Sequence, residues 1–288
     1  MANLKEIRSR ISSVASTMQI TSAMKMVSAA KLKRAQDAIT QMRPYSNKLT
    51  ELLSNLSSSL DSSEGEDFGQ KRNLKNILII TITSNRGLCG GFNSNIIKKA
   101  LEIFKKPEYS KSNIKVLSIG KKSSEFFSKK HKNVISTHDE IYSNITFEEV
   151  SNITEIIMEM FKKKEIDKAI LLYNQFKNAA TQYVVEEKYL PIEPKENTET
   201  NEKDYIFEPN QKEIVKDLIP QSLKTQLYKA ILDSHASEHG ARMTAMHKAT
   251  DNASELKGDL TLSYNKARQA AITAEILEIV GGAEALNS

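Results

Sequence analysis

The last third of the chain carries small and apolar residues at alternating spacings of three and four. The stretch from about Gln221 to Leu286 contains no proline and few glycines. The repeat runs through Ala249, Ala253, Leu256, Leu260, Ser263, Ala267, Ala270, Ala274 and Leu277. A heptad seam of this kind predicts a helix that supercoils with another helix. One helix over the whole stretch would be roughly 100 Å long, so much of it would project from a single domain.

The beginning of the chain carries a second seam, which could supply the partner helix. Its apolar positions, again three and four apart, are Leu4, Ile7, Ile11, Val14 and Met18. The same register then meets the polar residues Thr21, Lys25 and Ser28 before apolar residues return at Leu32, Ala35, Ile39 and Met42. An offset stripe of Ile20, Ala23, Met24, Val27 and Ala30 accompanies the interruption. We therefore expect the seam to shift to another face there, and Pro44 to kink or restart the helix.

The middle of the chain changes from helical spacing to short β-branched runs. The predicted strands are Ile77–Thr83, Ile114–Ile119, Asn133–Thr137, Asp167–Tyr173 and Gln182–Tyr189. Helical segments alternate with them at Ser94–Phe104, Lys121–Lys130 and from Thr146, whose capping box with Glu149 opens a helix to about Lys163. Alternation of this kind predicts a mostly parallel sheet with helices on both faces. The short turn at Gln175–Ala180 predicts that the last two strands pair antiparallel at an edge.

Two polar stretches border this middle part. Asp61–Gly69 is rich in Ser, Asp, Glu and Gly and is typical of a linker, and Pro191–Lys203 has the composition of a mobile loop. Tyr205–Phe207 is predicted to be a short extended piece. The predicted fold is α/β: a long antiparallel coiled coil of the terminal helices with an inserted Rossmann-like domain of about five strands. The expected divisions are residues 1–60, 70–208 and 209–288.

Composition and charge narrow the class of protein. The chain has 288 residues, a net charge of +5, no Trp and a single cysteine, Cys89. One cysteine cannot form an internal disulfide, which fits a reducing compartment. No run approaches 18 apolar residues, and the N-terminus lacks the pattern of a signal or transit peptide. The first 60 residues carry nine Lys or Arg and three Asp or Glu, a net +6 that favours an acidic partner.

Four features suggest chemistry, and each has a simpler structural explanation. The loop Gly87–Gly91 follows a strand, but it matches neither dinucleotide-binding nor P-loop spacing, so its glycines are expected to form a tight turn. His235, Glu238 and His239 match H-x-x-E-H, yet they lie in a heptad helix without a clear third ligand, which favours packing or solvent-facing histidines. Cys89 is expected to be a small buried residue. The cluster around Lys31 has interleaved Met and Ala, which suits a protein partner better than nucleic acid.

Long motifs at both ends and in the centre resemble one family. They are Lys5–Ile11, Ala23–Arg34, Asn85–Asn93, Ala241–Met246, Ala249–Ala253 and Tyr264–Leu286. Over essentially the whole chain the sequence resembles the gamma subunits of F-type ATP synthases. The resemblance implies a rotary central-stalk subunit that couples proton-driven rotation of the membrane c-ring to ATP synthesis or hydrolysis at beta-subunit sites. It implies no catalytic residue, cofactor or metal on this chain.

The resemblance also implies partners and a location. The partners would be the alpha and beta subunits of the catalytic hexamer, the epsilon subunit and the membrane c-ring, with no nucleic acid and no membrane span. The chain would lie peripherally at the cytoplasmic face of a bacterial inner membrane. The chloroplast insertion with paired cysteines is missing, so control by a disulfide is not expected.

The positions that match family contacts are expected to be subunit-interface residues. Those near the polar interruption are Met24, Lys25, Lys31, Lys33 and Arg34, which would face acidic loops of the beta subunits. Those near the end of the chain are Arg268, Gln269, Thr273, Glu275, Ile276, Leu277, Ile279 and Val280. The last four would form an apolar tip that turns inside the hexamer, where non-directional contacts permit sliding.

Two other functions remain open from the residues alone. The chain could be a structural coiled-coil adaptor whose α/β domain docks another protein. It could also be an enzyme that uses the crevice at the carboxyl ends of its parallel strands.

Overall fold

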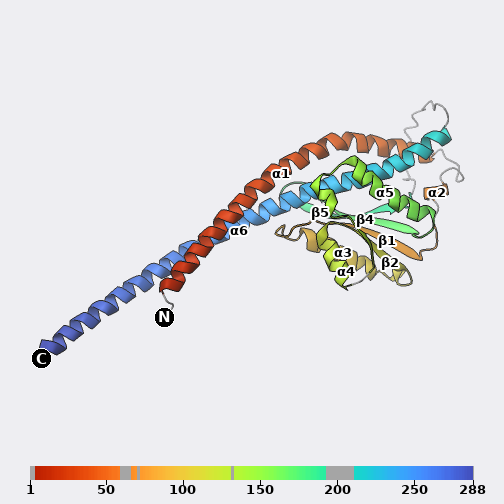
Figure 1. The fold of residues 1–288 in the computed structure, drawn as a ribbon. Helices are drawn as coiled ribbons and strands as arrows, with labels where there is room; N and C mark the ends of the chain where they lie inside the picture. The colour runs from red at the N-terminus through yellow and green to blue at the C-terminus, as the bar shows by residue number, and fades with distance from the viewer. Residues whose placement is uncertain (1–3, 59–65, 70–71, 131–132, 193–210, 288) are drawn as a thin grey trace. The chain divides into compact units, whose positions relative to one another are not determined.

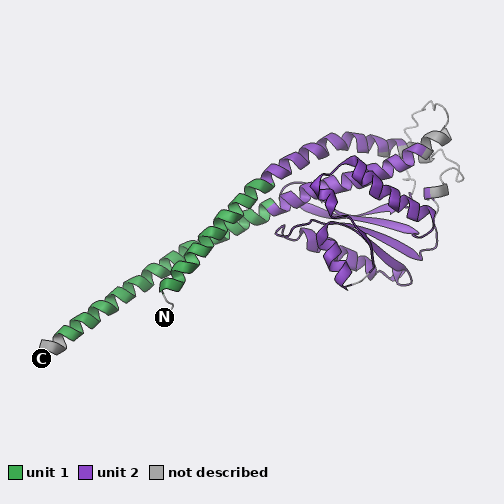
Figure 2. Ribbon diagram, in the orientation of Figure 1, with its two compact units in different colours: residues 1–28, 243–288 green, residues 29–242 purple. Residues whose placement is uncertain are grey.

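The structure is a computed structural model that describes residues 4–58, 66–69, 72–130, 133–192 and 211–287. Two long helices begin and end the chain, α1 (Leu4–Ser58) and α6 (Gln211–Asn287) (Figure 1). The chain divides into two compact units. We call residues 1–28 with 243–288 the coiled-coil unit and residues 29–242 the α/β unit (Figure 2). None of the described helices is long and apolar enough to cross a membrane.

The α/β unit is built on one sheet of five strands. They are β1 (Asn76–Ile82), β2 (Asn113–Ile119), β3 (Val134–Thr137), β4 (Lys168–Phe176) and β5 (Gln182–Leu190). The spatial order is β3-β2-β1-β4-β5, and every pair is parallel except β4 with β5. The predicted mostly parallel sheet with an antiparallel edge is therefore confirmed.

Helices cover both faces of the sheet (Figure 1). Helices α3 (Phe92–Phe104) and α4 (Lys121–Lys130) pack on one face, and α5 (Phe147–Lys162) and part of α6 pack on the other. Successive residues of β1 enter different cores: Ile77 and Ile79 lie in the first and Leu78 and Ile80 in the second. This explains why β1 is a continuous apolar run rather than an alternating one. Two short 3-10 helices, η1 (Pro107–Tyr109) and η2 (Glu140–Ser143), complete the unit.

The polar stretch expected to be a linker contains a short helix. Glu66–Gly69 forms α2, and Phe68 is buried against α5 with its ring stacked 6.3 Å from that of Phe161. The linker prediction is therefore wrong for these four residues, because one aromatic side chain anchors an otherwise polar segment. Ile192 also donates a backbone hydrogen bond to the Phe68 carbonyl (2.9 Å). The predicted mobile loop from residue 193 onward and the predicted extended piece Tyr205–Phe207 lie outside the described residues.

Helix α1 does not restart at Pro44, although a restart was one of the two outcomes that the sequence predicted there. It is assigned as one helix from Leu4 to Ser58, and α6 likewise continues through Pro220. The heptad register passes the proline unchanged, since Ser46 and Leu49 are buried. Pro44 itself is exposed, so the carbonyl that its ring leaves unpaired can bond to water.

In the coiled-coil unit the α1 seam keeps its face through the polar positions, so the predicted shift is wrong. Thr21 and Ser28 are buried, whereas Ile20 and Val27 of the offset stripe are 60% and 57% exposed. Both hydroxyls form hydrogen bonds close to their own positions. Thr21 donates to the Met18 carbonyl (3.1 Å), and its oxygen lies 2.8 Å from the Thr250 hydroxyl of α6. Ser28 donates to the Met24 carbonyl (2.8 Å). Small hydroxyl side chains can therefore occupy a seam without an orphaned polar group.

The α6 seam differs from the predicted one at two positions before Arg268. From Met246 to Ala267 its buried and half-buried residues are Met246, Ala249, Thr250, Ala253, Lys257, Leu260, Tyr264 and Ala267. Leu256 and Ser263, which the prediction placed in the seam, are exposed. From Arg268 to Ala283 every side chain is exposed. Figure 2 shows the reason, because α6 continues beyond the N-terminal end of α1 within this unit.

Candidate functional site

Helix α6 crosses the carboxyl ends of the central strands, where open parallel sheets usually bind ligands. Ser237 donates a hydrogen bond to the Asn174 carbonyl of β4 (2.9 Å), and Asn174 donates to the Phe92 carbonyl of α3 (3.2 Å). A Cβ on Gly240 would lie 3.3 Å from both the Cα and the carbonyl oxygen of Ala179, so the glycine permits close approach of the helix to the β4–β5 turn. We call this contact region of Ser237, Gly240 and Arg242 the α6 joint.

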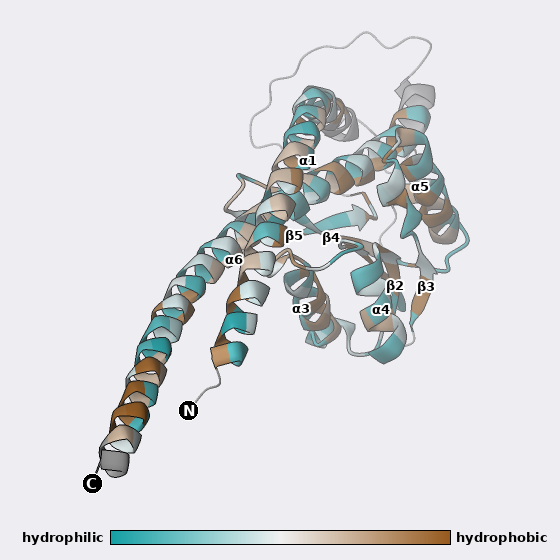
Figure 3. Cartoon of the chain, turned by 60° about the vertical axis from the view of Figure 1, so that its left-hand side comes forward, coloured by the Kyte–Doolittle hydropathy of each residue, from teal (hydrophilic) through white to brown (hydrophobic). Residues whose placement is uncertain are grey.

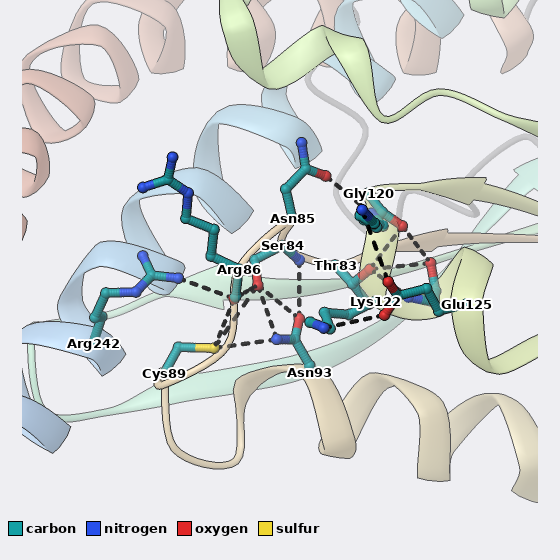
Figure 4. A network of polar contacts seen from close by, with 12 residues as sticks. Thr83, Ser84, Asn85, Arg86, Cys89, Asn93, Gly120, Lys122, Glu125 and Arg242 are labelled. Atoms are coloured by element: carbon teal, nitrogen blue, oxygen red, sulfur yellow. Dashed lines mark hydrogen bonds and ion pairs between the residues drawn. The ribbon is translucent and has the colours of Figure 1, made fainter.

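Arg242 is the most heavily bonded side chain of the α6 joint. Its guanidinium is 8% exposed and lies 2.7 Å from the Glu238 carboxylate. It also donates to the Arg86 carbonyl (3.2 Å), as Figure 4 shows, and to the Gly87 carbonyl (3.3 Å). Burial raises the pKa of Glu238, although the charge of Arg242 opposes that rise. Arg242 therefore neutralises a buried carboxylate and fixes the strand-to-helix loop at the same time.

The loop after β1 is a tight turn with its own hydrogen bonds, as the sequence predicted. Asn93 accepts from the Ser84 backbone N–H (2.9 Å) and donates to the Cys89 sulfur (3.2 Å) (Figure 4). Leu88 and Gly90 have φ of 61° and 58°, the left-handed conformation that glycine adopts without strain. Cys89 is 2% exposed, and burial raises the pKa of its thiol, so the prediction of a buried packing residue is confirmed. The arrangement favours a structural loop over a phosphate cradle.

The two histidines of the H-x-x-E-H pattern are packed inside the α/β unit. Their Nε2 atoms lie 3.1 Å apart, and the Nδ1 of His239 lies 3.3 Å from an Arg242 nitrogen. Burial lowers the pKa of His235 to about 4 and that of His239 to about 3. Within the described ranges, no group of three or more His, Cys, Asp or Glu side chains is placed to hold a metal ion. The packing interpretation is therefore favoured over a zinc site.

We expect acid to destabilise the α/β unit through these histidines. The unfolded chain, with histidine pKa values near 6.5, binds more protons than the folded chain from about pH 6.5 down to about pH 4. The free energy of unfolding should therefore fall as pH falls through this window, by at most about 1.4 kcal/mol per pH unit for each histidine. Changing both to Gln should flatten this slope in urea titrations at several pH values.

The matched control for that titration is His247→Gln. His247 is 60% exposed, so its replacement should leave the slope unchanged. Glu238 acts in the opposite sense near the acidic end, because its raised pKa favours proton binding by the folded chain. The comparison is therefore between variants that all retain Glu238. An unchanged slope in the double variant would contradict the assignment.

The predicted interface residues near the polar interruption differ in exposure. Met24 and Lys25 are half-buried, whereas Lys31, Lys33 and Arg34 are exposed. Lys33 pairs with Asp37 on the next turn (3.1 Å). Lys31 lies close enough to His235 and Glu238 to lower the pKa of both. Lys31, Lys33 and Arg34 are therefore three exposed cations of α1, of which Lys33 is paired with Asp37.

The predicted interface residues of the α6 end form one continuous exposed surface. Arg268, Gln269, Thr273 and Glu275 are exposed, and Thr273 donates only to the Gln269 carbonyl of its own helix (2.9 Å). The apolar tip is exposed as well, with exposures of 53% for Ile276, 66% for Leu277, 65% for Ile279 and 55% for Val280. Figure 3 shows hydrophobic colouring on these last turns of α6. Exposed apolar sets are typical of surfaces that contact another molecule.

Several exposed apolar residues of the same unit were not predicted from the sequence. They are Met26 (62% exposed), Leu262 (62%) and Ile272 (48%). Each is an apolar residue outside the heptad register, and this feature of the sequence could have identified it as a candidate interface residue. The Arg242 contacts were also missed, because 155 residues separate Arg242 from Gly87 along the chain.

The chain is similar to known proteins over its whole length. A family described as ATP synthase matches residues 3–286. The ATP synthase gamma chain of Christiangramia forsetii is 60% identical over 287 residues, and that of Flavobacterium johnsoniae is 62% identical over 289, each covering 100% of both chains.

Solved structures give the same result. A chain from the central stalk and c-ring structure of the Tetrahymena thermophila mitochondrial ATP synthase is 25% identical, with a TM-score of 0.60 over 80% of this chain and 99% of that one. A chain of the Euglena gracilis mitochondrial ATP synthase is 21% identical, with a TM-score of 0.71 over 98% of this chain and 94% of that one. The second likeness concerns the fold alone.

Proposed function

This chain belongs to the family of ATP synthase gamma chains, and we propose that its exposed helix surfaces are where it meets the other subunits of that complex. As a member of this family it is the central-stalk rotor subunit of a rotary ATP synthase and part of an ATPase complex.

The main support for the proposal is the exposed apolar tip of α6. Among the described residues no second helix lies beside Ile276, Leu277, Ile279 and Val280, and all four are more than half exposed. A protein leaves such a surface uncovered when another molecule covers it. We assign this surface to the interior of the hexamer of alpha and beta subunits. Apolar contacts lack direction, so they permit the tip to turn against its surroundings.

The other predicted interface residues take complementary roles in this proposal. Arg268, Gln269, Thr273 and Glu275 form the polar surface just before the tip, where directional contacts would transmit force. Lys31, Lys33 and Arg34 supply positive charge toward acidic loops of the beta subunits, with Met24 and Lys25 beside them. The epsilon subunit and the membrane c-ring are assigned to the α/β unit.

Torque needs a firm joint between the helix and the α/β unit. The α6 joint supplies it through the buried Arg242–Glu238 pair, the Ser237 hydrogen bond and the close approach at Gly240. Dense packing of this kind transmits strain rather than absorbing it. Rotation of the c-ring, driven by protons, would therefore reach the beta-subunit sites through α6.

We assign no catalytic step to this chain itself. The crevice at the carboxyl ends of β1 and β4, which an enzyme of this fold would use, is crossed by α6, and Arg242 already occupies the carbonyls of the adjacent loop. The chain acts by changing the state of sites on other subunits. Its proposed location is the cytoplasmic face of a bacterial inner membrane, as a peripheral subunit.

We expect that replacing all four tip residues, Ile276, Leu277, Ile279 and Val280, with Asp will reduce co-isolation with alpha and beta subunits at least tenfold. Each fully buried side chain of this kind contributes about 1.5–3 kcal/mol to an apolar contact, and buried carboxylates add a penalty. The fold should be preserved, because exposed positions change the free energy of unfolding by only about 0.5 kcal/mol each. The measurement is affinity purification of the complex with quantitative subunit analysis.

The matched control is Tyr183→Ser, which removes an aromatic side chain that is 48% exposed on β5. This variant should co-isolate with the other subunits at the level of the natural chain. Equal co-isolation of the tip variant and the control would contradict the assignment of the tip. A natural chain that purifies as a lone homodimer would contradict the whole proposal and favour a coiled-coil adaptor.

A further inference from the structure

The α/β unit has a groove that the proposed function does not use. It encloses about 370 Å³ where β3 ends and α5 begins, and its lining residues include His138, Asp139, Glu140, Glu149, Ile153 and Ile156. The volume falls within the range of sites that hold a ligand or a set of side chains. We call it the β3–α5 groove.

Three carboxylates give the groove a negative charge. Asp139, Glu140 and Glu149 form no ion pair within the described part of the chain. The charge of Lys121 lowers the pKa of Asp139, but the Lys121 ammonium lies 4.0 Å from the Glu125 carboxylate. Burial lowers the pKa of His138, so this side chain is neutral at pH 7 and does not offset the charge.

One carboxylate oxygen in the groove lacks a donor. The Oδ1 atom of Asp139 is shielded from solvent and accepts no hydrogen bond from the described residues. Burial also raises the pKa of this carboxyl group. A shielded carboxylate oxygen without a donor is uncommon in folded proteins.

Beyond Glu149, the α5 side of the groove is apolar. Ile153 and Ile156 follow one another at helical spacing on α5, and Ile156 remains 45% exposed. A surface that joins an aliphatic wall to carboxylates fits a long basic side chain, which buries its methylene stem and keeps its charged head on the acids. The described residues offer no metal site that would use these carboxylates instead.

We propose that the β3–α5 groove binds a Lys- or Arg-bearing segment of another subunit of the ATP synthase. The basic head lies against Asp139 and Glu149, and the stem lies along Ile153 and Ile156. The proposal rests on the proposed function, because the partner is taken from the same complex. Charge complementarity selects a basic protein segment over an acidic or purely apolar one.

The test places a photoreactive benzoylphenylalanine at position 156 of the full chain and irradiates the purified, ATP-hydrolysing complex. The same probe at Tyr183, which is exposed on β5, serves as the control site. Mass spectrometry then identifies the cross-linked peptide. The expected peptide comes from another subunit and contains Lys or Arg within a few residues of the attachment point, and the probe at Tyr183 does not yield it.

A pair of charge-reversal variants provides a second test of the proposal. Glu149→Lys should reduce the yield of that cross-link at least fivefold, whereas Glu159→Lys on the same helix should not, because Glu159 lies outside the groove and pairs with Lys163 (3.0 Å). An absent cross-link, a cross-link to a second copy of this chain, a peptide without a basic residue, or equal yields in the two variants would overturn the proposal. The complex is purified first, so failure of assembly, which concerns the proposed function, is recognised separately.

Discussion

Replacing Gly120 with alanine is expected to lower the free energy of unfolding of the α/β unit by about 3–5 kcal/mol. Gly120 has φ of 101°, and a Cβ on it would lie 2.0 Å from the Thr83 carbonyl oxygen. The clash is with backbone at the ends of β1 and β2, so no side-chain rotation relieves it. The substitution therefore forces two central strands apart and adds the strain of a positive φ.

Gly87→Ala is the matched control for this change. Gly87 has no atom within 4 Å of a built Cβ and lies in the neighbouring loop. Its replacement should alter the free energy of unfolding by no more than about 1 kcal/mol. Urea denaturation followed by circular dichroism measures both variants. Equal effects at the two glycines would contradict the packing described at the ends of β1 and β2.

Removing Arg242 should cost about 3–5 kcal/mol, because it leaves the Glu238 carboxylate buried without a partner. The Arg242→Ala variant also loses the hydrogen bonds to the Arg86 and Gly87 carbonyls. We therefore expect faster amide hydrogen exchange in the loop from Gly87 to Gly91 as well as a lower free energy of unfolding. The two readouts together separate loss of the α6 joint from general destabilisation.

The double variant Glu238→Ala with Arg242→Ala is the control that isolates the buried charge. It should be more stable than Arg242→Ala alone, since neither charge is then left unpaired. Loop exchange should stay fast in both variants, because both lack the guanidinium. A double variant less stable than the single one would show that the ion pair is not the main contribution of Arg242.

The sequence predicted those parts of the fold that depend on local periodicity. The β-branched run of β1 and the Thr146 cap, whose hydroxyl accepts from the Glu149 N–H (3.3 Å), are local signals. The register of the α6 seam was harder to predict from the sequence, because small residues occupy adjacent positions. Ala249 and Thr250 both suit a heptad, and only the hydrogen bond between Thr250 and Thr21 selects the second.

The α6 joint could not be predicted in the same way. Its partners are brought together by the sheet and by the path of α6, and Arg242 and Gly87 are 155 residues apart. For the offset stripe, the sequence pattern predicted a contact that the structure does not contain among the described residues. Ile20 and Val27 were expected to form a seam, but they are exposed, because hydroxyl side chains hold the original register. Apolar side chains off the seam indicate a partner outside the chain.

Rotation of the α/β unit inside an assembled complex would show directly that this chain is a rotor. A Lys111→Cys variant provides an exposed attachment point for a bead, and Cys89 does not compete for labelling because it is 2% exposed. With the alpha and beta subunits held on a surface, the account predicts that the bead turns in one direction while ATP is hydrolysed. ATP hydrolysis at the full rate with a stationary bead would contradict it.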